Sequence, residues 1–189
     1  MIILSFDIGI KNLAFVLVET GKGDSLTTKI LEWDIISVQS DGKKEDFNIV
    51  SENLIQVLYD KFGSDSYDVV LIENQPSLKN PVMKSIQMII FTFFKMRAFQ
   101  EGEGLKVKFV SASSKLKVHN TCDTSHITTK DKYRKNKLTS IAYCQHFLEL
   151  SKNVNGVWID VFDKCKKKDD RADTLGLAIC FIENIRLPQ

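Results

Sequence analysis

The sequence predicts an α/β fold: a five-stranded mixed sheet, with three antiparallel strands followed by two parallel strands, flanked by helices. Three observations support this fold class. Short apolar runs of strand length come first, and segments whose apolar residues recur every three or four positions then alternate with further runs. The composition, 43% hydrophobic and 26% charged, is that of a globular protein. A length of 189 residues suits one domain, so we expect residues 1–189 to form a single domain.

The first three strands are expected at residues 1–6, 13–18 and 29–38. Asp7-Ile8-Gly9 separates the first two apolar runs, and a turn region at residues 21–28 precedes the third. Short connections of this kind join neighbouring antiparallel strands. The three strands should therefore form an antiparallel meander.

Helices are expected to alternate with the two remaining strands. Apolar residues recur at helical spacing over residues 45–62, and Gly63 ends that pattern. The continuous apolar run at residues 68–73 is typical of a parallel strand that is covered on both faces. Residues 82–100 contain no Gly or Pro and predict a long helix, and residues 106–111 alternate as a strand. The helices thus serve as crossovers to the two parallel strands.

The last third of the sequence predicts a long connection and two more helices. Residues 112–130 have no clear periodicity, and a loop of that length is usually functional. Residues 132–150 and 171–185 are expected to be helical. No apolar run reaches the ~18 residues that span a bilayer, so no membrane partner is expected. The first residues lack a signal-peptide pattern, which predicts a cytoplasmic protein with reduced cysteines.

Charge is distributed unevenly along the chain. Residues 1–78 carry 6 basic and 13 acidic side chains, residues 79–137 carry 13 and 4, and the remainder carries 7 and 7. The basic middle third suits a polyanion such as DNA, because bound phosphates release condensed counterions. A lysine-rich face that is simply solvated is the alternative interpretation.

Four acidic residues are candidates for a catalytic site. Asp7 and Glu73 end two apolar runs that we expect to lie side by side in the sheet, so their carboxylates should share one edge. Asp170 and Asp173 are three positions apart and should lie on one face of the first turn of a helix. Each also has an ordinary structural explanation, because acids are common in turns and at strand ends and are favoured at helix N-termini.

Together these four side chains predict a magnesium or manganese site. Hard divalent cations prefer carboxylate and water oxygens as ligands. Two such ions ~3.5–4 Å apart can activate a water molecule and stabilise the leaving oxygen in phosphodiester cleavage. The substrate of that reaction is a polyanion, which the basic middle third of the sequence can bind.

Four segments with acidic or basic side chains follow one another along the chain. They are FDIGIKNLA from Phe6, IENQP from Ile72, YRKNK from Tyr133 and DDRADTLGLA from Asp169. In sequence and order they resemble RuvC-type Holliday-junction resolvases, in particular the poxvirus branch, which is related to the fungal mitochondrial enzymes. The resemblance spans nearly the whole chain. It implies an RNase H-like fold, a homodimer, and paired symmetric nicks across a four-way DNA junction that leave 5′-phosphate and 3′-hydroxyl ends.

The resemblance also implies roles for individual residues. Asp7, Glu73, Asp170 and Asp173 match the metal-binding acids, with Asp169 as an alternative to Asp170. Lys135 or Lys137 matches the basic position beside the scissile phosphate, and Lys135 is the expected catalytic lysine. The expected cofactor is Mg²⁺, replaceable by Mn²⁺, with two ions per active site. Basic residues near these motifs are expected to bind DNA: Lys11, Lys132, Arg134, Lys137, Lys166, Lys167 and Lys168.

Three other functions fit parts of the sequence. An actin-like ATPase also opens with a strand that ends in Asp-x-Gly, but the second phosphate-binding hairpin of that class is absent from this sequence. A non-catalytic nucleic-acid-binding module of related fold should lack at least one of the four acids, and all four are present. A zinc site at His119, Cys122 and His126 has no evident fourth ligand.

The helix expected at residues 82–100 is apolar on more than one face. Its apolar side chains include Met88, Ile89, Ile90, Phe91, Phe93 and Phe94. This pattern predicts either a homodimer interface or a helix buried inside the monomer. The phenylalanines of the helix, Phe99 included, can also stack on unpaired bases, although core or interface packing is the preferred interpretation.

Overall fold

The structure of the 189-residue chain is a computed structural model. It describes residues 1–21, 25–39, 46–78, 80–102, 104–118 and 121–186.

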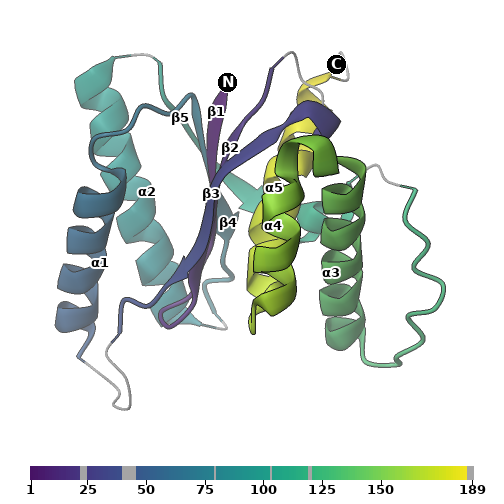
Figure 1. Ribbon diagram of the computed structural model, residues 1–189. Helices are drawn as coiled ribbons and strands as arrows, with labels where there is room; N and C mark the ends of the chain where they lie inside the picture. Colours follow the sequence, from purple (N-terminus) through teal and green to yellow (C-terminus); the bar gives the residue numbers. More distant parts are fainter. Residues whose placement is uncertain (22–24, 40–45, 79, 103, 119–120, 187–189) are drawn as a thin grey trace.

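Five strands of the described chain form one sheet, in the order β3-β2-β1-β4-β5 (Figure 1). The strands are β1 (Ile2–Asp7), β2 (Leu13–Glu19), β3 (Lys29–Ile36), β4 (Val69–Asn74) and β5 (Lys106–Ser111). Strand β2 pairs antiparallel with β1 and β3, whereas β4 is parallel to β1 and to β5. The predicted order of three antiparallel strands followed by two parallel strands is confirmed.

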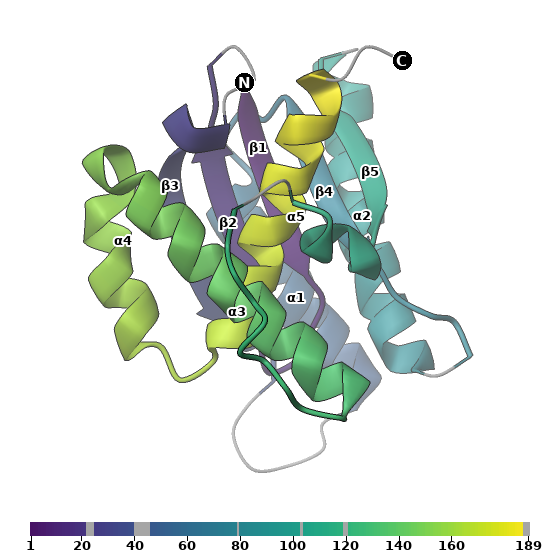
Figure 2. The same ribbon diagram turned by 90° about the vertical axis from the view of Figure 1, so that its right-hand side faces the viewer.

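Helices cover both faces of the sheet (Figures 1 and 2). On one face lie α1 (Phe47–Phe62) and α2 (Pro81–Glu101), and on the other lie α3 (Lys132–Leu150), α4 (Lys152–Lys164) and α5 (Lys168–Arg186). Strand β1 is central, and its alternate side chains point to opposite faces. Leu4 and Phe6 therefore enter the core beneath α1 and α2, while Ile3 enters the core beneath α5.

Short polar side chains set the starts of three helices. The Asp46 side chain accepts a hydrogen bond from the Asn48 amide before α1, and the Asp131 side chain accepts from the Tyr133 amide before α3. Asn80 accepts from the Met83 amide, and Pro81 follows at the first position of α2. Each cap satisfies a backbone donor that the helix itself leaves unpaired.

Helix α4 differs from the sequence prediction, which places no helix between residues 150 and 171. Its inward side chains do share one face, because Asn155, Trp158 and Phe162 are three and four positions apart and are buried or partly buried. This face packs against β3. The Asn155 side chain accepts a hydrogen bond from the Ile30 amide and donates one to the Thr28 carbonyl, each over 2.9 Å.

Two further differences bear on the functional site. Helix α5 begins at Lys168, three residues before the predicted start, so Asp169 and Asp170 lie inside its first turn. The predicted loop at residues 112–130 opens with a 3-10 helix, η2 (Ala112–Leu116), which packs against α5. A second short 3-10 helix, η1 (Ser25–Thr27), lies in the predicted turn region before β3.

Candidate active site

Two carboxylates meet at one edge of the sheet. Strands β1 and β4 run parallel with Phe6 opposite Ile72, so the next residues, Asp7 and Glu73, emerge at the same end of the sheet. The chain turns away tightly after Asp7. A Cβ atom at Gly9 would lie 2.3 Å from the Asn12 carbonyl oxygen, so only glycine fits this turn. The predicted neighbourhood of Asp7 and Glu73 is confirmed.

Helix α5 brings two more carboxylates to the same place. It packs on β1 and β2, and its first two turns carry Asp170 and Asp173. All four predicted acids, together with Asp169, line one cavity of about 630 Å³. Glu73 and Asp173 are the most enclosed of them, with 6% and 8% of their surfaces exposed. The structure therefore brings together the four residues that the sequence singled out.

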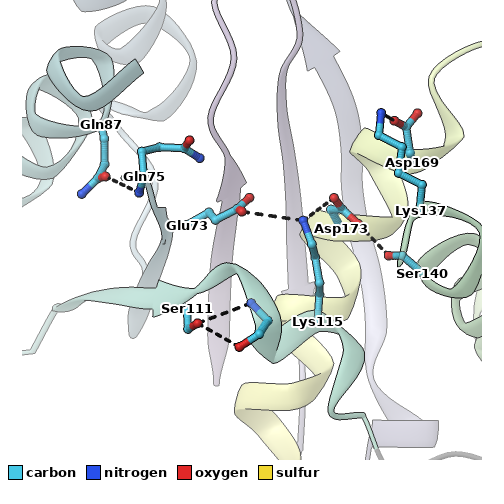
Figure 3. A network of polar contacts seen from close by, with 10 residues as sticks. Glu73, Gln75, Gln87, Ser111, Lys115, Lys137, Ser140, Asp169 and Asp173 are labelled. Atoms are coloured by element: carbon cyan, nitrogen blue, oxygen red, sulfur yellow. Dashed lines mark hydrogen bonds and ion pairs between the residues drawn. The ribbon is translucent and has the colours of Figure 1, made fainter. Parts of the chain in front are cut away.

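A lysine that the sequence reading missed lies among these carboxylates. Lys115, in η2, forms an ion pair with Asp173, and its Nζ atom is 3.6 Å from Oε1 of Glu73 (Figure 3). Only 16% of its side chain is exposed. In the sequence, Lys115 is one of three lysines in the segment at residues 112–130, which has no periodicity, so no local signal marks it.

The pKa values of the carboxyl groups record their crowding. Burial raises the pKa of Asp7, and the neighbouring Glu73 carboxyl raises it further. Burial likewise raises the pKa of Asp170, with Asp169 adding to the effect. Burial also raises the pKa of Asp173, because its effect is larger than the opposing effect of the Lys115 ammonium. Ionising these three carboxyl groups is costly because they are buried close together. A bound cation would lower that cost, so the site favours cations.

The charge of Lys115 is held by the same cluster. Burial alone would lower its pKa, but the carboxylates of Asp173, Glu73 and Asp7 outweigh burial and raise it. The lysine is therefore a cation under ordinary conditions, placed between acids that would otherwise repel one another.

Neighbouring side chains fix the two sides of the cluster (Figure 3). The Ser140 hydroxyl on α3 donates a hydrogen bond of 2.6 Å to Oδ1 of Asp173. On the opposite side, the buried Gln87 of α2 accepts a hydrogen bond of 2.7 Å from the Gln75 amide, two residues after Glu73. The carboxylates thus lie between a strand-end loop that α2 holds and a helix that α3 supports.

Asp169 and Asp170 have different surroundings. Asp169 forms an ion pair with Lys137, and although burial opposes its charged form, this lysine lowers the pKa of Asp169. Oδ2 of Asp170 is buried and has no hydrogen-bond partner among the described residues. An unpaired buried carboxylate oxygen is costly unless something binds it, which favours Asp170 over Asp169 as a ligand.

The oxygen-rich lining fits the metal that the sequence predicts. Hard divalent cations take carboxylate oxygens, and the unpaired oxygen of Asp170 is such a donor. No three His, Cys, Asp or Glu side chains of the described residues are already arranged around a common metal position. In this arrangement the Lys115 ammonium lies between Glu73 and Asp173 and supplies positive charge to the carboxylates.

The basic residues predicted to act on DNA are spread over several surfaces. Lys132 and Lys137 line the carboxylate cavity, with Tyr133 and Asn136 between them on α3. Lys135, the expected catalytic lysine, is exposed and does not line this cavity. Lys115 is the lysine in contact with Glu73 and Asp173, and a catalytic role for Lys135 stays a prediction.

The remaining predicted DNA-binding residues lie outside the cavity lining. Arg134 borders a separate groove of about 480 Å³ between α3 and residues 126–129. Lys11, Lys166 and Lys167 are exposed, whereas Lys168 opens α5 and forms an ion pair with Asp163. These positions suit contacts with a substrate that extends beyond the cavity.

The structure bears on two further sequence hypotheses. Of the proposed zinc ligands, His119 lies outside the described residues, and the Cys122 thiol donates a hydrogen bond to the Ala142 carbonyl. The phenylalanines of α2 divide between two environments, since Phe94 is fully buried and Phe99 is 91% exposed. Helix α2 therefore faces both the core and the surface.

No helix in the described ranges is long and apolar enough to cross a membrane.

Comparison with known proteins identifies relatives of the chain. A viral protein that is uncharacterised, from Acanthamoeba polyphaga mimivirus, is 34% identical over 133 residues, which are 67% of this chain and 31% of that protein. The chain thus matches about a third of the length of that relative.

Three solved structures share the fold. The fowlpox virus resolvase in complex with Holliday junction DNA has a TM-score of 0.62 and 22% identity, covering 99% of this chain and all of that one. The yeast mitochondrial Holliday junction resolvase has a TM-score of 0.61 and 18% identity over 96% of this chain and 78% of that one. RuvC of T. thermophilus, also solved with junction substrate, has a TM-score of 0.58 and 12% identity over 98% and 95% of the two chains. The chain has the RNase H-like fold of these proteins.

The family comparison covers almost the whole sequence. The family model described as "Poxvirus A22 protein" matches residues 1–185, a range that includes all four carboxylates and Lys115. This match confirms the resemblance to the poxvirus branch that the sequence motifs indicated. The chain therefore belongs to the poxvirus A22 protein family.

Proposed function

We propose that the protein is a structure-selective endonuclease that resolves four-way DNA junctions by paired, symmetric nicks. The observation that carries this proposal is the cavity that Asp7, Glu73, Asp170 and Asp173 line together, with Lys115 in contact with Glu73 and Asp173. Family membership supports it, and so does a fold shared with a fowlpox virus resolvase that was solved with Holliday junction DNA. Each nick would leave a 5′-phosphate and a 3′-hydroxyl end.

The four carboxylates would hold Mg²⁺, or Mn²⁺ in its place, with two ions per active site. When bound, such ions activate a water molecule and stabilise the leaving oxygen of a phosphodiester. The unpaired oxygen of Asp170 and the raised pKa values of Asp7 and Asp173 support this assignment, because both costs fall when a cation binds.

Lys115 is the lysine that we assign to the scissile phosphate. Lys115 lines the cavity, and its ammonium lies beside Glu73 and Asp173, where a bound phosphodiester would meet the carboxylates. Positive charge placed where negative charge develops lowers the barrier of phosphoryl transfer. Ser140 would keep Asp173 oriented toward this lysine, since its hydroxyl holds the second carboxylate oxygen.

The basic rim would hold the DNA backbone. Lys132 and Lys137 extend the cavity lining along α3, and the exposed Lys166 and Lys167 lie just before α5. Contacts of this type bind phosphates without reading sequence, so affinity should fall steeply with salt. A member of a poxvirus family would act on viral DNA at a cytoplasmic site of replication.

Symmetric resolution would need a homodimer, because two cuts must be made at symmetry-related phosphates. Helix α2 offers a surface for the partner. Its outward side chains include Met88, Met96 and Phe99, which are 41%, 59% and 91% exposed. Ile90 and Phe94, which the sequence reading included in this interface, belong instead to the core of the monomer.

A direct test compares a labelled four-way junction with linear duplex of the same sequence, in Mg²⁺, Mn²⁺ or EDTA. We expect paired nicks at symmetric positions in the junction, none in the duplex, and none in EDTA. Asp173→Asn serves as the matched control, because it keeps the basic rim intact. Cutting of the duplex at a similar rate, or cutting in EDTA, would contradict the proposal.

A further inference from the structure

The position of Lys115 depends on an unusually close approach between η2 and α5. Gly176 lies on α5, three residues after Asp173, and faces the backbone of Lys115. A Cβ atom at position 176 would lie 3.1 Å from the Cβ atom and from the carbonyl oxygen of Lys115, and 3.4 Å from its Cα atom. The two distances of 3.1 Å are shorter than ordinary van der Waals contacts of 3.4–4 Å. A Cβ atom at this position therefore fits only if the Lys115 backbone gives by a few tenths of an ångström.

The need for glycine at this position is one of space. Gly176 does not have a positive φ angle, since among the described residues Gly102 is the glycine that does. Its backbone conformation is therefore one that any residue adopts. Glycine in the interior of a helix is less favourable than alanine. Gly156, inside α4, gives a comparison, because a Cβ atom there would meet nothing within 4 Å. Gly176 is thus a poor helix former at a point where α5 lies close to the Lys115 backbone.

We propose that Gly176 is a positioning residue for Lys115. By letting η2 lie against α5, it places the Lys115 ammonium between Asp173 and Glu73. Asp173 and Gly176 belong to the same helix, so the helix fixes both the anion and the contact that brings the cation to it. A methyl group at position 176 would move the Lys115 backbone by a few tenths of an ångström, and the displacement would be carried to Nζ.

The experiment compares Gly176→Ala with Gly156→Ala, two alanine substitutions inside helices. Thermal unfolding is measured first, and both variants should fold. The first arm of the experiment measures cleavage and rests on the proposed function. It compares single-turnover rates at saturating enzyme with Mg²⁺. Gly176→Ala should cut the junction about tenfold more slowly, with junction affinity changed less than about twofold. Gly156→Ala should cut at the wild-type rate.

A second arm measures the position of Lys115 without cleavage. Limited acetylation followed by peptide mass spectrometry reports how readily each amine reacts. Lys115 should react several-fold faster in Gly176→Ala than in wild type, relative to the exposed Lys166. If wild-type protein cuts no junction, the proposed function fails, while this arm still decides the role of Gly176.

A double substitution separates positioning from general packing. If Gly176 acts through Lys115, adding Gly176→Ala to Lys115→Ala should cause no further loss of rate. Independent losses that multiply would overturn the proposal. So would a Gly176→Ala protein with wild-type rate and wild-type acetylation, or one that fails to fold, since the contact would then support the fold as a whole.

Discussion

Replacing Ser140 by alanine should cost about 1.5–3 kcal/mol of stability. Ser140 is 3% exposed, and its hydroxyl donates a hydrogen bond of 2.6 Å to the nearly buried carboxylate of Asp173. Hydrogen bonds to charged groups contribute about 1.5–3 kcal/mol, and alanine leaves the acceptor without this donor. In a protein of this size each kcal/mol shifts Tm by about 2–4 °C, so Tm should fall by roughly 3–12 °C.

The same substitution should also raise the Mn²⁺ concentration needed for half-maximal cleavage. The Ser140 hydroxyl orients one oxygen of Asp173, and partners that orient a ligand typically contribute about 10- to 100-fold to metal affinity or activity. A titration of cleavage rate against Mn²⁺ would measure this change, and calorimetry would measure Tm on the same protein.

Ser85→Ala is the matched control for Ser140→Ala. Ser85 is an exposed serine within α2, and its hydroxyl donates only to the Pro81 carbonyl of its own helix. Its replacement should change stability by less than about 0.5 kcal/mol and leave the Mn²⁺ requirement unchanged. If Ser140→Ala behaved like this control, the hydrogen bond to Asp173 would have no part in holding the site.

Four further predictions follow from the carboxylates, the lysines and the surface of α2. Asp7→Asn should abolish cutting in Mg²⁺ while junction binding in a gel-shift assay is kept, and near-normal turnover would remove Asp7 from the ligand set. Lys115→Ala should lower the single-turnover cleavage rate by about 100-fold. Lys135→Ala should weaken junction binding with little change in that rate. The reverse result would favour Lys135 as the catalytic lysine. Replacing Lys166 and Lys167 together should lower the slope of log affinity against log salt by about 1.8. Phe99→Ser should shift a dimer toward monomer in equilibrium sedimentation, and a wild-type monomer with junction bound would exclude symmetric resolution by a dimer.

The parts of the fold that were predictable are those in which local pattern and burial agree. Strands β1 and β4 are covered on both faces, so their sequences are continuous apolar runs that end at Asp7 and Glu73. Once both runs are assigned to neighbouring parallel strands, the meeting of these carboxylates follows from sheet geometry. Helical spacing placed Asp170 and Asp173 on one face in the same way.

Lys115 was not predictable because its role arises from tertiary packing. It contacts Asp173 across 58 sequence positions, and η2 has no periodicity that would indicate which of its side chains is enclosed. Helix α4 is a different case, because Asn155, Trp158 and Phe162 lie at helical spacing on its buried side. Its local sequence carried a helical signal that the prediction did not include.

The sequence also indicates which side chains of α3 face the cavity. Tyr133, Asn136 and Lys137 are three and four positions apart, the spacing that puts side chains on one face of a helix, and all three line the carboxylate cavity. Lys135 falls outside that spacing and is exposed elsewhere on α3. Helical spacing within the YRKNK segment therefore places Lys137, rather than Lys135, beside the carboxylates.

The acidic cluster is assembled from parts of the chain that are translated at different times. Asp7 and Glu73 lie on strands that leave the ribosome early, whereas Asp170 and Asp173 lie on α5, the last helix of the described chain. Translation proceeds at about 5–20 residues per second, so for several seconds a nascent chain has one half of the acidic cluster without the other. Lys115 is translated in that interval, before the Asp173 carboxylate and the Gly176 surface that hold it exist. Under the proposed function, a growing polypeptide cannot cut DNA until α5 has docked on β1 and completed the acidic cluster.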